Sequence, residues 1–290
     1  MAEGHALVKP FLKWAGGKRQ LLSEIKKHIP GDMDNYTYYE PFVGAGAVLF
    51  DLRPRRAVIN DVNTQLMLTY AVIKENVEEL IVLLKNHKDM NDKEYYYETR
   101  NLDRDSAAFN KLTHAEKAAR LIFLNKTCFN GLYRVNSRGL FNVPYGRYKN
   151  PAICEESVLR RISRYLNTNE VKILNIDFEQ ALPDAGKHSL IYFDPPYHSQ
   201  DKTNFTGYQP GGFGREEQER LRDVMVDMTR RGAKCLLSNA DTAYIRELYA
   251  GNRFEIIPLR AKRAINADSS GRGSVQEVLV KNWKDSGASC

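Results

Sequence analysis

The residues with the clearest chemical potential are Asp194-Pro195-Pro196-Tyr197, which directly follow the apolar run 189–193. Two prolines after a run of β-forming residues predict a buried strand that stops there, because proline has no N–H to donate to a ladder. Asp194 is therefore expected at the carboxyl edge of a sheet, where ligands bind in open α/β folds. A carboxylate, a free proline carbonyl and an aromatic face favour a pocket for an exocyclic amine on a planar base. The alternative is a strand followed by a tight turn.

A second group of residues, 40–46, follows a strand pattern and precedes a helix pattern. Gly44 and Gly46 would let the backbone approach a nucleoside-like ligand near a helix N-terminus. Leu49 stands where a dinucleotide fingerprint needs its third glycine, which disfavours an NAD-dependent oxidoreductase. Asp61, at the end of the next strand, is placed to accept hydrogen bonds from ribose hydroxyls.

The segment 11–18 puts an aromatic residue, two glycines and two lysines before the first helix pattern. No Walker pattern fits it. We interpret Lys18, or the following helix N-terminus, as a partner for the carboxylate of a cofactor. Structural capping of the helix is the competing interpretation.

A third segment, 129–149, is dense in Asn, Gly, Arg and aromatic residues and has no period typical of a core element. This composition predicts a hairpin or long loop that presents groups able to contact phosphates, base edges and stacked bases. A surface loop that is basic by chance is the alternative.

The elements that must position these residues form two blocks in which strand and helix patterns alternate, which predicts an α/β fold with a mostly parallel sheet. The expected strands cover residues 37–43, 57–60, 171–176, 189–193, 233–237, 254–258 and 275–280. Helices are expected around residues 21–29, from about 47, and over 215–231. Between the blocks, apolar residues repeat at helical spacing over 66–84 and 115–124.

The composition is that of a soluble protein whose 290 residues, 42% of them hydrophobic, can bury a sizeable core. The formal charge of +7 favours a polyanionic partner. Cys128, Cys154, Cys235 and Cys290 lie far apart, which disfavours a zinc site or a disulfide framework. No signal-peptide core or membrane-spanning stretch is expected, and a cytoplasmic location follows as the default.

Five motifs in a fixed order, F-L-K-W-A-G-G-K, E-P-F-V-G-A-G, F-N-G-L-Y-R-x-N, F-N-V-P-Y-G-R-Y and D-P-P-Y, resemble the Dam family of DNA adenine-N6 methyltransferases, in the order of its α class. The resemblance covers essentially the whole chain. It implies a Rossmann-like core that uses S-adenosylmethionine (SAM), with an inserted helical and hairpin target-recognition subdomain. The implied boundaries are 1–64 for the first part of the core, 65–154 for the insertion, and 155–290 for the second part with the D-P-P-Y site.

The same resemblance implies roles for individual residues. The catalytic residues would be Asp194, Pro195, Pro196 and Tyr197. SAM would be bound by Trp14, Lys18, Phe42, Gly44, Gly46, Asp61, Asp177, Phe178 and Asp194. DNA would be contacted by Lys13, Lys126, Phe129, Asn130, Leu132, Arg134, Asn136, Asn142, Pro144, Tyr148 and Lys149. Phe129 stands where a tyrosine is often found, and Tyr133 occupies a variable position.

The implied activity is methyl transfer from SAM to N6 of adenine in duplex DNA, most often in GATC, by base flipping and without a metal. We expect a monomer or weak dimer on double-stranded DNA, in the cytoplasm of a bacterial or phage-infected cell. Restriction-modification, strand marking linked to DNA replication or repair, and phage protection all remain open as biological roles.

Three rival interpretations remain. Amino methyltransferases that act on cytosine N4 often carry Ser at the position of Asp194, and those that act on protein glutamine or RNA adenine more often carry Asn. From another class, the chain could be a DNA-binding module that has lost turnover and uses SAM as a structural ligand.

Overall fold

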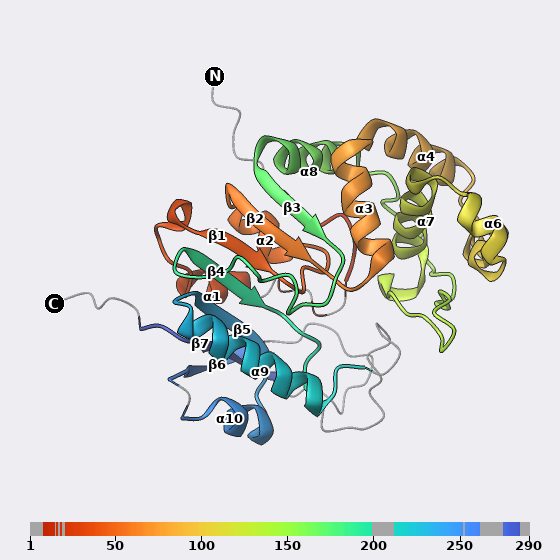
Figure 1. Cartoon of the computed structure of the whole chain (residues 1–290). Helices are drawn as coiled ribbons and strands as arrows, with labels where there is room; N and C mark the ends of the chain where they lie inside the picture. Colours follow the sequence, from red (N-terminus) through yellow and green to blue (C-terminus); the bar gives the residue numbers. More distant parts are fainter. Residues whose placement is uncertain are drawn as a thin grey trace.

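A seven-stranded sheet forms the centre of the described part of the chain, with the order β3-β2-β1-β4-β5-β7-β6 (Figure 1). β7 is antiparallel to both of its neighbours, whereas the other pairs are parallel. This confirms the predicted α/β class, and the order of the first five strands is that of a doubly wound Rossmann-like sheet. The strands are β1 (Thr37–Glu40), β2 (Arg56–Asn60), β3 (Glu170–Leu174), β4 (Ser189–Phe193), β5 (Lys234–Ala240), β6 (Glu255–Ala261) and β7 (Val275–Lys281).

The computed structural model describes residues 8–14, 16, 18, 21–198, 212–251, 253–261 and 275–284, without the side chains of 260, 261, 275 and 276. Ala15, Gly17 and Cys290, which belong to the patterns discussed above, lie outside these residues. The α-helices are α1 (Leu22–Lys27), α2 (Ala47–Leu52), α3 (Thr64–Glu75), α4 (Val77–Asp89), α5 (Lys93–Asn101), α6 (Ser106–Lys111), α7 (His114–Thr127), α8 (Glu156–Thr168), α9 (Arg215–Arg230) and α10 (Ala243–Tyr249). Short 3₁₀ turns are η2 (Met33–Asn35), η3 (Leu102–Arg104) and η4 (Phe129–Gly131).

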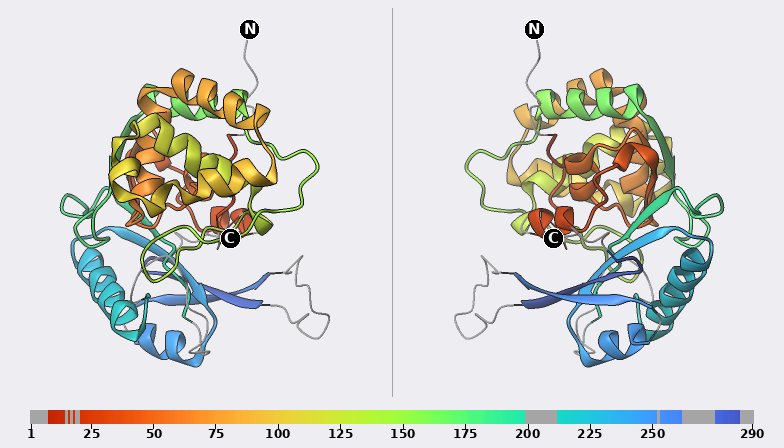
Figure 2. Two further views of the ribbon diagram at one scale, coloured as in Figure 1. Left: turned by 90° about the vertical axis from the view of Figure 1, so that its right-hand side faces the viewer. Right: turned by 90° about the vertical axis from the view of Figure 1, so that its left-hand side faces the viewer.

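Both faces of the sheet are buried, as the side-chain alternation of β4 shows. Leu190 and Tyr192 belong to a core cluster shared with α2, α3, α4, α7 and α8. Ile191 and Phe193 belong to a second cluster shared with α9 and α10. Successive side chains of a strand point to opposite faces, so a strand covered on both sides reads as an unbroken apolar run. The views in Figure 2 show α9 and α10 on the opposite side of the molecule from α3 to α8.

Several helices begin at a side chain that satisfies a backbone N–H of the first turn. Asn63 caps α3, Asp92 caps α5, Asp105 caps α6 and Thr242 caps α10. α7 begins with a capping box in which Thr113 and Glu116 exchange hydrogen bonds. In the core that α3, α4, α7 and α8 share with the sheet, α3 and α8 contact β3, and α7 packs on α3 and α4.

Some predicted boundaries were wrong. β1 ends at Glu40 rather than 43, because Pro41 cannot donate to the ladder. β3 ends at Leu174 rather than 176, because the Asn60 side chain bonds both backbone groups of Ile176. The expected helix over 66–84 is two helices that part at Asn76. β5, β6 and β7 are longer than predicted at their carboxyl ends, and α5, α6, α8 and α10 were not predicted.

The loop between β1 and α2 depends on Gly46, whose φ is +76°. A Cβ atom there would lie 2.6 Å from the Tyr70 hydroxyl and 2.8 Å from the Phe50 ring. Gly139 has the same φ of +76°, but nothing lies within 4 Å of its Cβ position. An alanine at Gly139 would therefore bear backbone strain alone, whereas an alanine at Gly46 would also overlap with its neighbours.

We expect Gly139→Ala to lower the free energy of unfolding by about 1–2 kcal/mol, the cost of a left-handed alanine. Gly46→Ala should lower it by about 1–3 kcal/mol more, because the methyl group also overpacks the core. Urea denaturation of both variants measures the difference. Equal losses would show that the loop can move away from Tyr70 and Phe50.

Candidate active site

The order of the sheet reverses between β1 and β4, which pair with each other while their next connections run to opposite edges. Ligands of open α/β sheets bind outside the carboxyl ends of the strands at such a point. β1 leads there into the Gly44–Gly46 loop and β4 leads into Asp194. Figure 1 shows the arrowheads of β3 and β4 pointing to the side where α7 and the segment after it lie.

Asp194 is paired with a buried lysine. Lys18 Nζ lies 2.7 Å from Asp194 Oδ1, and its side chain is only 4% exposed, whereas that of Asp194 is 19% exposed. The same ammonium donates to the Gly16 carbonyl at 2.6 Å and lies 4.6 Å from the centre of the Tyr197 ring. One cation therefore contacts both ends of the D-P-P-Y motif, and part of the carboxylate stays accessible.

Burial raises the pKa of Asp194 to about 6, because a charged carboxylate loses hydration there. The Lys18 ammonium opposes this rise, and the negative charge of Glu277 adds to it. Asp194 is thus ionised at neutral pH, while its proton affinity is well above that of an exposed aspartate.

Tyr197 is fixed by a residue from the far end of the chain. Its hydroxyl donates to Glu277 Oε2 at 2.7 Å, and Glu277 belongs to β7. Burial raises the pKa of Tyr197 well above its usual value, so the hydroxyl keeps its proton and the hydrogen bond. Sequence reasoning missed Glu277, because a glutamate within a strand pattern carries no signal for a contact with a residue 80 positions away.

The Pro196 carbonyl is held by a chain of buried amides. It accepts from Gln218 Nε2 at 3.0 Å, and Gln218 Oε1 accepts from Asn239 Nδ2 at 3.0 Å. The Asn239 side-chain oxygen Oδ1 then accepts the backbone N–H of His198 at 3.0 Å. No donor to the Pro195 carbonyl is found in the described part of the chain. The clamp therefore fixes the loop and leaves the Pro195 carbonyl and the Asp194 carboxylate as acceptors.

The loop after β1 is tied to the ends of β2 and β3. Asp61 accepts from the Gly44 N–H at 3.1 Å and from the Asn63 N–H at 2.9 Å. Burial raises the pKa of Asp61 to about 6, although these hydrogen bonds oppose the rise. Asn60 donates to the carbonyls of Pro41 and Ile176, which joins three strand ends.

Two apolar side chains at this edge are exposed, Val62 by 48% and Ile176 by 37%. They follow Asp61 and precede Asp177, respectively, and a planar ligand beside Asp61 would cover apolar surface there. Trp14 lies against the same loop, since a Cβ at Gly44 would be 3.0 Å from its ring. The Trp14 ring stacks on Tyr133 with a 4.9 Å centroid distance.

Asp177 and Phe178 lie under an arginine that sequence reasoning missed. Arg220 Nη2 is 2.6 Å from Asp177 Oδ2, and its guanidinium lies 4.4 Å from the centre of the Phe178 ring. Phe178 packs on Phe42 at a centroid distance of 5.2 Å. Phe42, Asp177 and Phe178, all expected near a cofactor, are therefore neighbours.

The segment after α7 is an open hairpin with bridges Cys128↔Tyr145 and Val135↔Phe141. This confirms the predicted hairpin or long loop. Two of its large apolar side chains are exposed, Phe129 by 51% and Leu132 by 40%. Other exposed residues of the expected DNA-binding set are Lys13, Asn130, Arg134, Pro144 and Lys149. We call residues 129–149 the recognition hairpin.

Several other members of that set already have partners. Arg134 Nε donates to Asn142 Oδ1 at 2.7 Å, and Lys13 Nζ donates to the Tyr148 hydroxyl at 3.3 Å. Lys126 pairs with Glu155 at 2.6 Å. The Asn136 side chain accepts the backbone N–H groups of Arg138 and Leu140, so it holds a turn.

Residues 13 and 14 are joined to the start of the recognition hairpin by a buried amide, Asn125 in α7. Its Oδ1 accepts from Lys13 N at 2.9 Å, and its Nδ2 donates to the carbonyls of Lys13 and Gly131. The Asn125 side chain is fully buried. Trp14 and Lys13 are thereby fixed relative to the start of the hairpin.

Comparison with known proteins places this geometry in context. Residues 14–265 match the family of D12 class N6 adenine-specific DNA methyltransferases. The chain is 45% identical to the Type II methyltransferase M1.LlaDCHI of Lactococcus lactis subsp. cremoris over 95% of its length and 96% of the relative. It is 43% identical to the Type II methyltransferase M.MjaIII of Methanocaldococcus jannaschii over 95% and 99%. It is 33% identical to the DNA adenine methylase of Escherichia coli K12 over 94% of both chains.

No helix in the described ranges is both long and apolar enough to cross a membrane. No group of three or more His, Cys, Asp or Glu side chains that could hold a metal ion occurs among the described residues.

The pairing of Lys18 with Asp194 gives a direct prediction. A ¹³C NMR titration of the Asp194 carboxyl group should give a pKa of about 6 rather than the ordinary 3.8. Lys18→Met should raise this pKa further, because the ammonium favours the ionised carboxylate. Lys26→Met, which breaks the more exposed pair with Asp51, is the matched control and should leave it unchanged. An Asp194 pKa that is the same with and without Lys18 would contradict the pairing.

Proposed function

The chain belongs to the D12 class of N6 adenine-specific DNA methyltransferases, and we propose that it methylates N6 of an adenine rotated out of duplex DNA, in GATC, with SAM as methyl donor. The observation that carries the proposal is the corner after β4. A partly accessible carboxylate, a proline carbonyl free of described donors and a fixed aromatic ring meet there at the switch point of the sheet.

The position of Lys18 supports the binding of an amine at this corner. Its ammonium is a donor that lies 2.7 Å from Asp194 and above the Tyr197 ring. The exocyclic amine of adenine also offers N–H donors, attached to a planar ring that can stack on Tyr197. On substrate binding, the amine would take the place of the lysine at Asp194.

The target amine inside a base pair is inaccessible, so the adenine must leave the stack at a cost of roughly a few kcal/mol. Stacking on Tyr197 would offset about 1–3 kcal/mol of that cost. The ring is suited to the task because Glu277 holds its hydroxyl. The exposed Phe129 and Leu132 of the recognition hairpin supply apolar surface for the bases left behind.

The amine is a poor nucleophile because its lone pair is delocalised into the ring. Two acceptors, the Asp194 carboxylate and the Pro195 carbonyl, would bind both N–H groups and favour a pyramidal nitrogen. When bound, SAM supplies a methyl group on a positively charged sulfur, an activated leaving group. Asp194 stabilises the charge that develops on N6, and its pKa of about 6 suits it to accept the proton that N6 loses.

The residues around the neighbouring strand ends fit SAM. Asp61 offers a carboxylate to hydroxyl groups, and Val62 and Ile176 offer apolar surface to a planar ring. We expect Trp14, Lys18, Phe42, Gly44, Gly46, Asp177 and Phe178 to complete the site, and Lys18 released from Asp194 would meet the cofactor carboxylate.

The recognition hairpin, within an inserted subdomain that we place at 65–154, would read the DNA sequence. GATC is supported by the resemblance of this hairpin to the Dam family. The two Type II relatives support a role in restriction-modification. A single hairpin per chain fits a monomer or weak dimer on DNA, acting in the cytoplasm of a bacterial or phage-infected cell.

The function is tested by incubating the protein with SAM labelled in the methyl group and with duplexes that contain or lack GATC. Nucleoside mass spectrometry should identify N6-methyladenine in the GATC duplex. Asp194→Ala should abolish transfer and keep DNA binding, while Asp194→Asn separates the shape of the side chain from its charge. Methylated cytosine, or near-normal turnover by Asp194→Ala, would refute the proposal.

Arg134 and Lys149 should differ in what they contribute. If Arg134 contacts a guanine edge, Arg134→Ala should lower the preference for GATC over duplexes altered at the outer base pair by about 1–3 kcal/mol. Lys149→Ala should weaken binding to all sequences and reduce the salt slope by about 1, as expected for a phosphate contact. Equal loss on all sequences in Arg134→Ala would show that this residue does not read bases.

A further inference from the structure

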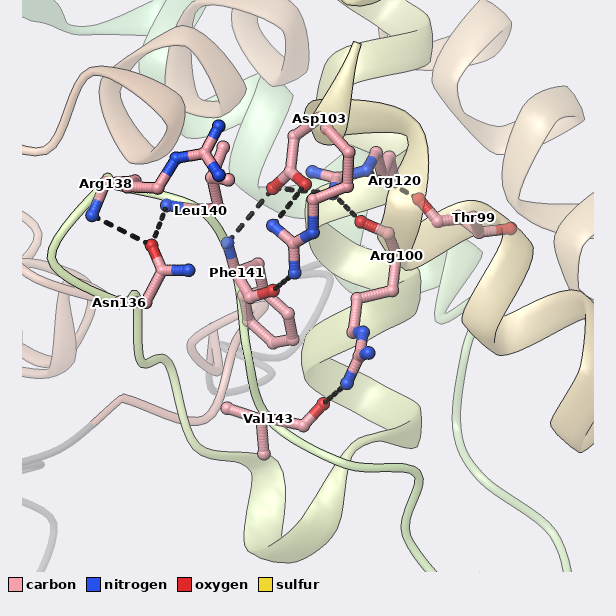
Figure 3. A network of polar contacts seen from close by, with 10 residues as sticks. Thr99, Arg100, Asp103, Arg120, Asn136, Arg138, Leu140, Phe141 and Val143 are labelled. Carbon is pink, nitrogen blue, oxygen red and sulfur yellow. Dashed lines mark hydrogen bonds and ion pairs between the residues drawn. The ribbon is translucent and has the colours of Figure 1, made fainter.

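A buried ion pair lies behind the recognition hairpin, away from the D-P-P-Y corner. Arg120 Nη2 in α7 is 3.0 Å from Asp103 Oδ2 in η3, and the two side chains are only 2% and 5% exposed. Neither residue belongs to a motif that suggests function. Figure 3 shows the Asp103 carboxylate between Arg120 and the backbone N–H of the hairpin residue Phe141.

The pair reaches the hairpin through its backbone. Asp103 Oδ2 accepts the Phe141 N–H at 3.0 Å. Arg104, held by Asp103 Oδ1 at 2.7 Å, donates to the Phe141 carbonyl at 2.6 Å. Phe141 thus receives from two side chains what a neighbouring strand would otherwise supply, an acceptor for its N–H and a donor for its carbonyl.

A second attachment lies two residues further along. The Val143 carbonyl accepts from the Tyr96 hydroxyl at 2.8 Å. It also accepts from Arg100 Nη1 at 3.3 Å (Figure 3). Phe141 and Val143 are also buried, with exposed fractions of only 2% and 1%. Asn142, between them, therefore projects to the opposite side, because alternate residues of an extended chain face opposite ways.

Asn142 is the residue that holds Arg134. It accepts from Arg134 Nε at 2.7 Å, and its N–H donates to the Arg134 carbonyl at 3.1 Å. The two anchored residues on either side of Asn142 thus set where the Arg134 guanidinium lies. A slip of one residue would turn Asn142 inward and lose this contact.

The anchor itself is tied to rigid elements. Arg120 Nε donates to the Thr99 carbonyl at 2.8 Å, and its Nη2 donates to the Arg100 carbonyl at 2.7 Å, both in the last turn of α5. Buried ion pairs are weak contributors to stability, since apolar residues of similar volume often replace them without loss. The gain from this one is a single geometry for the groups that it holds.

We propose that Asp103, Arg104 and Arg120 are positioning residues that fix the register of residues 134–143 and thereby set how sharply the protein discriminates among DNA sequences. The inference rests on the proposed function of the hairpin in sequence recognition. It assigns a role in specificity to residues that contact the backbone of the hairpin and the end of α5.

Three variants test it. Arg104→Met removes the donor to the Phe141 carbonyl from a side chain that is 32% exposed, so we expect the fold to be retained. Asp103→Asn keeps the shape and removes the charge. Asp103→Leu combined with Arg120→Met removes both buried charges together, which avoids leaving one unpaired. Val224→Ala, a buried apolar truncation in α9, is the control for a general loss of stability.

The readout is the ratio of kcat/KM for the duplex that the wild-type protein prefers to kcat/KM for duplexes altered by one base pair beside the adenine. The fraction of active protein cancels in this ratio, so a merely structural role would not move it. We expect the ratio to fall about tenfold in the three variants, of the order of one lost base contact. The value of kcat at saturating preferred DNA and the equilibrium affinity for SAM should stay within about twofold, and Val224→Ala should keep the wild-type ratio.

If the three variants lower the melting temperature as Val224→Ala does but keep the wild-type ratio, the cluster only packs the hairpin and the inference is wrong. That outcome leaves the proposed function intact. If instead the wild-type protein shows no sequence preference, the proposed site specificity fails and takes the inference with it. A preferred sequence other than GATC would correct the proposed site while the comparison of variants still decides the inference.

Discussion

The site depends on one electrostatic constraint, a carboxylate placed at the end of a strand that is buried at every position. Asp194 follows Phe193 directly, and the only described cation that pairs with it is Lys18, itself 4% exposed. Burial disfavours the charge and raises the pKa to about 6, whereas Lys18 keeps the carboxylate ionised at neutral pH. An acceptor held in such surroundings forms strong hydrogen bonds. Under the proposed function, the substrate amine would compete with Lys18 for this carboxylate.

Buried amides and carboxylates, rather than ladder hydrogen bonds, hold the loops around this constraint. Asn60 joins three strand ends, Gln218 and Asn239 hold Pro196, and Asn125 joins Lys13 to Gly131. Asp103 and Arg104 hold the recognition hairpin in the same manner. Side-chain clamps of this kind fix a loop while leaving selected backbone carbonyls free for a ligand. Rigid loops at the edge of the sheet can hold a reactant in one orientation, which lowers the barrier of a reaction.

Much of the fold could be predicted because the responsible signals are local. The apolar run before Pro195 fixed both ends of β4, and Arg215 begins α9 as expected. The end of a strand could not be predicted where a side chain from another element sets it. β3 is an example, because the Asn60 side chain binds the backbone just after it. The helices α5, α6 and α10 did carry a signal, an Asp or Thr at the N-cap, but they are short. In the site, D-P-P-Y was visible in the sequence, whereas Gln218 sits in a charged run typical of a solvated helix face, and Glu277 lies 80 residues from Tyr197.

The proposed hydrogen bond from the amine of the extruded base to Asp194 is tested most directly by a double-mutant cycle. The cycle combines one substitution in the protein with one replacement of the target base. Binding is measured with a non-reactive SAM analogue, using duplexes whose target base is adenine or purine, which lacks the amine. We expect wild-type protein to bind the adenine duplex more tightly than the purine duplex, and Asp194→Ala to lose that difference. If Asp194→Ala kept the full wild-type preference for adenine, the carboxylate would not be holding the amine, and the central claim would be wrong.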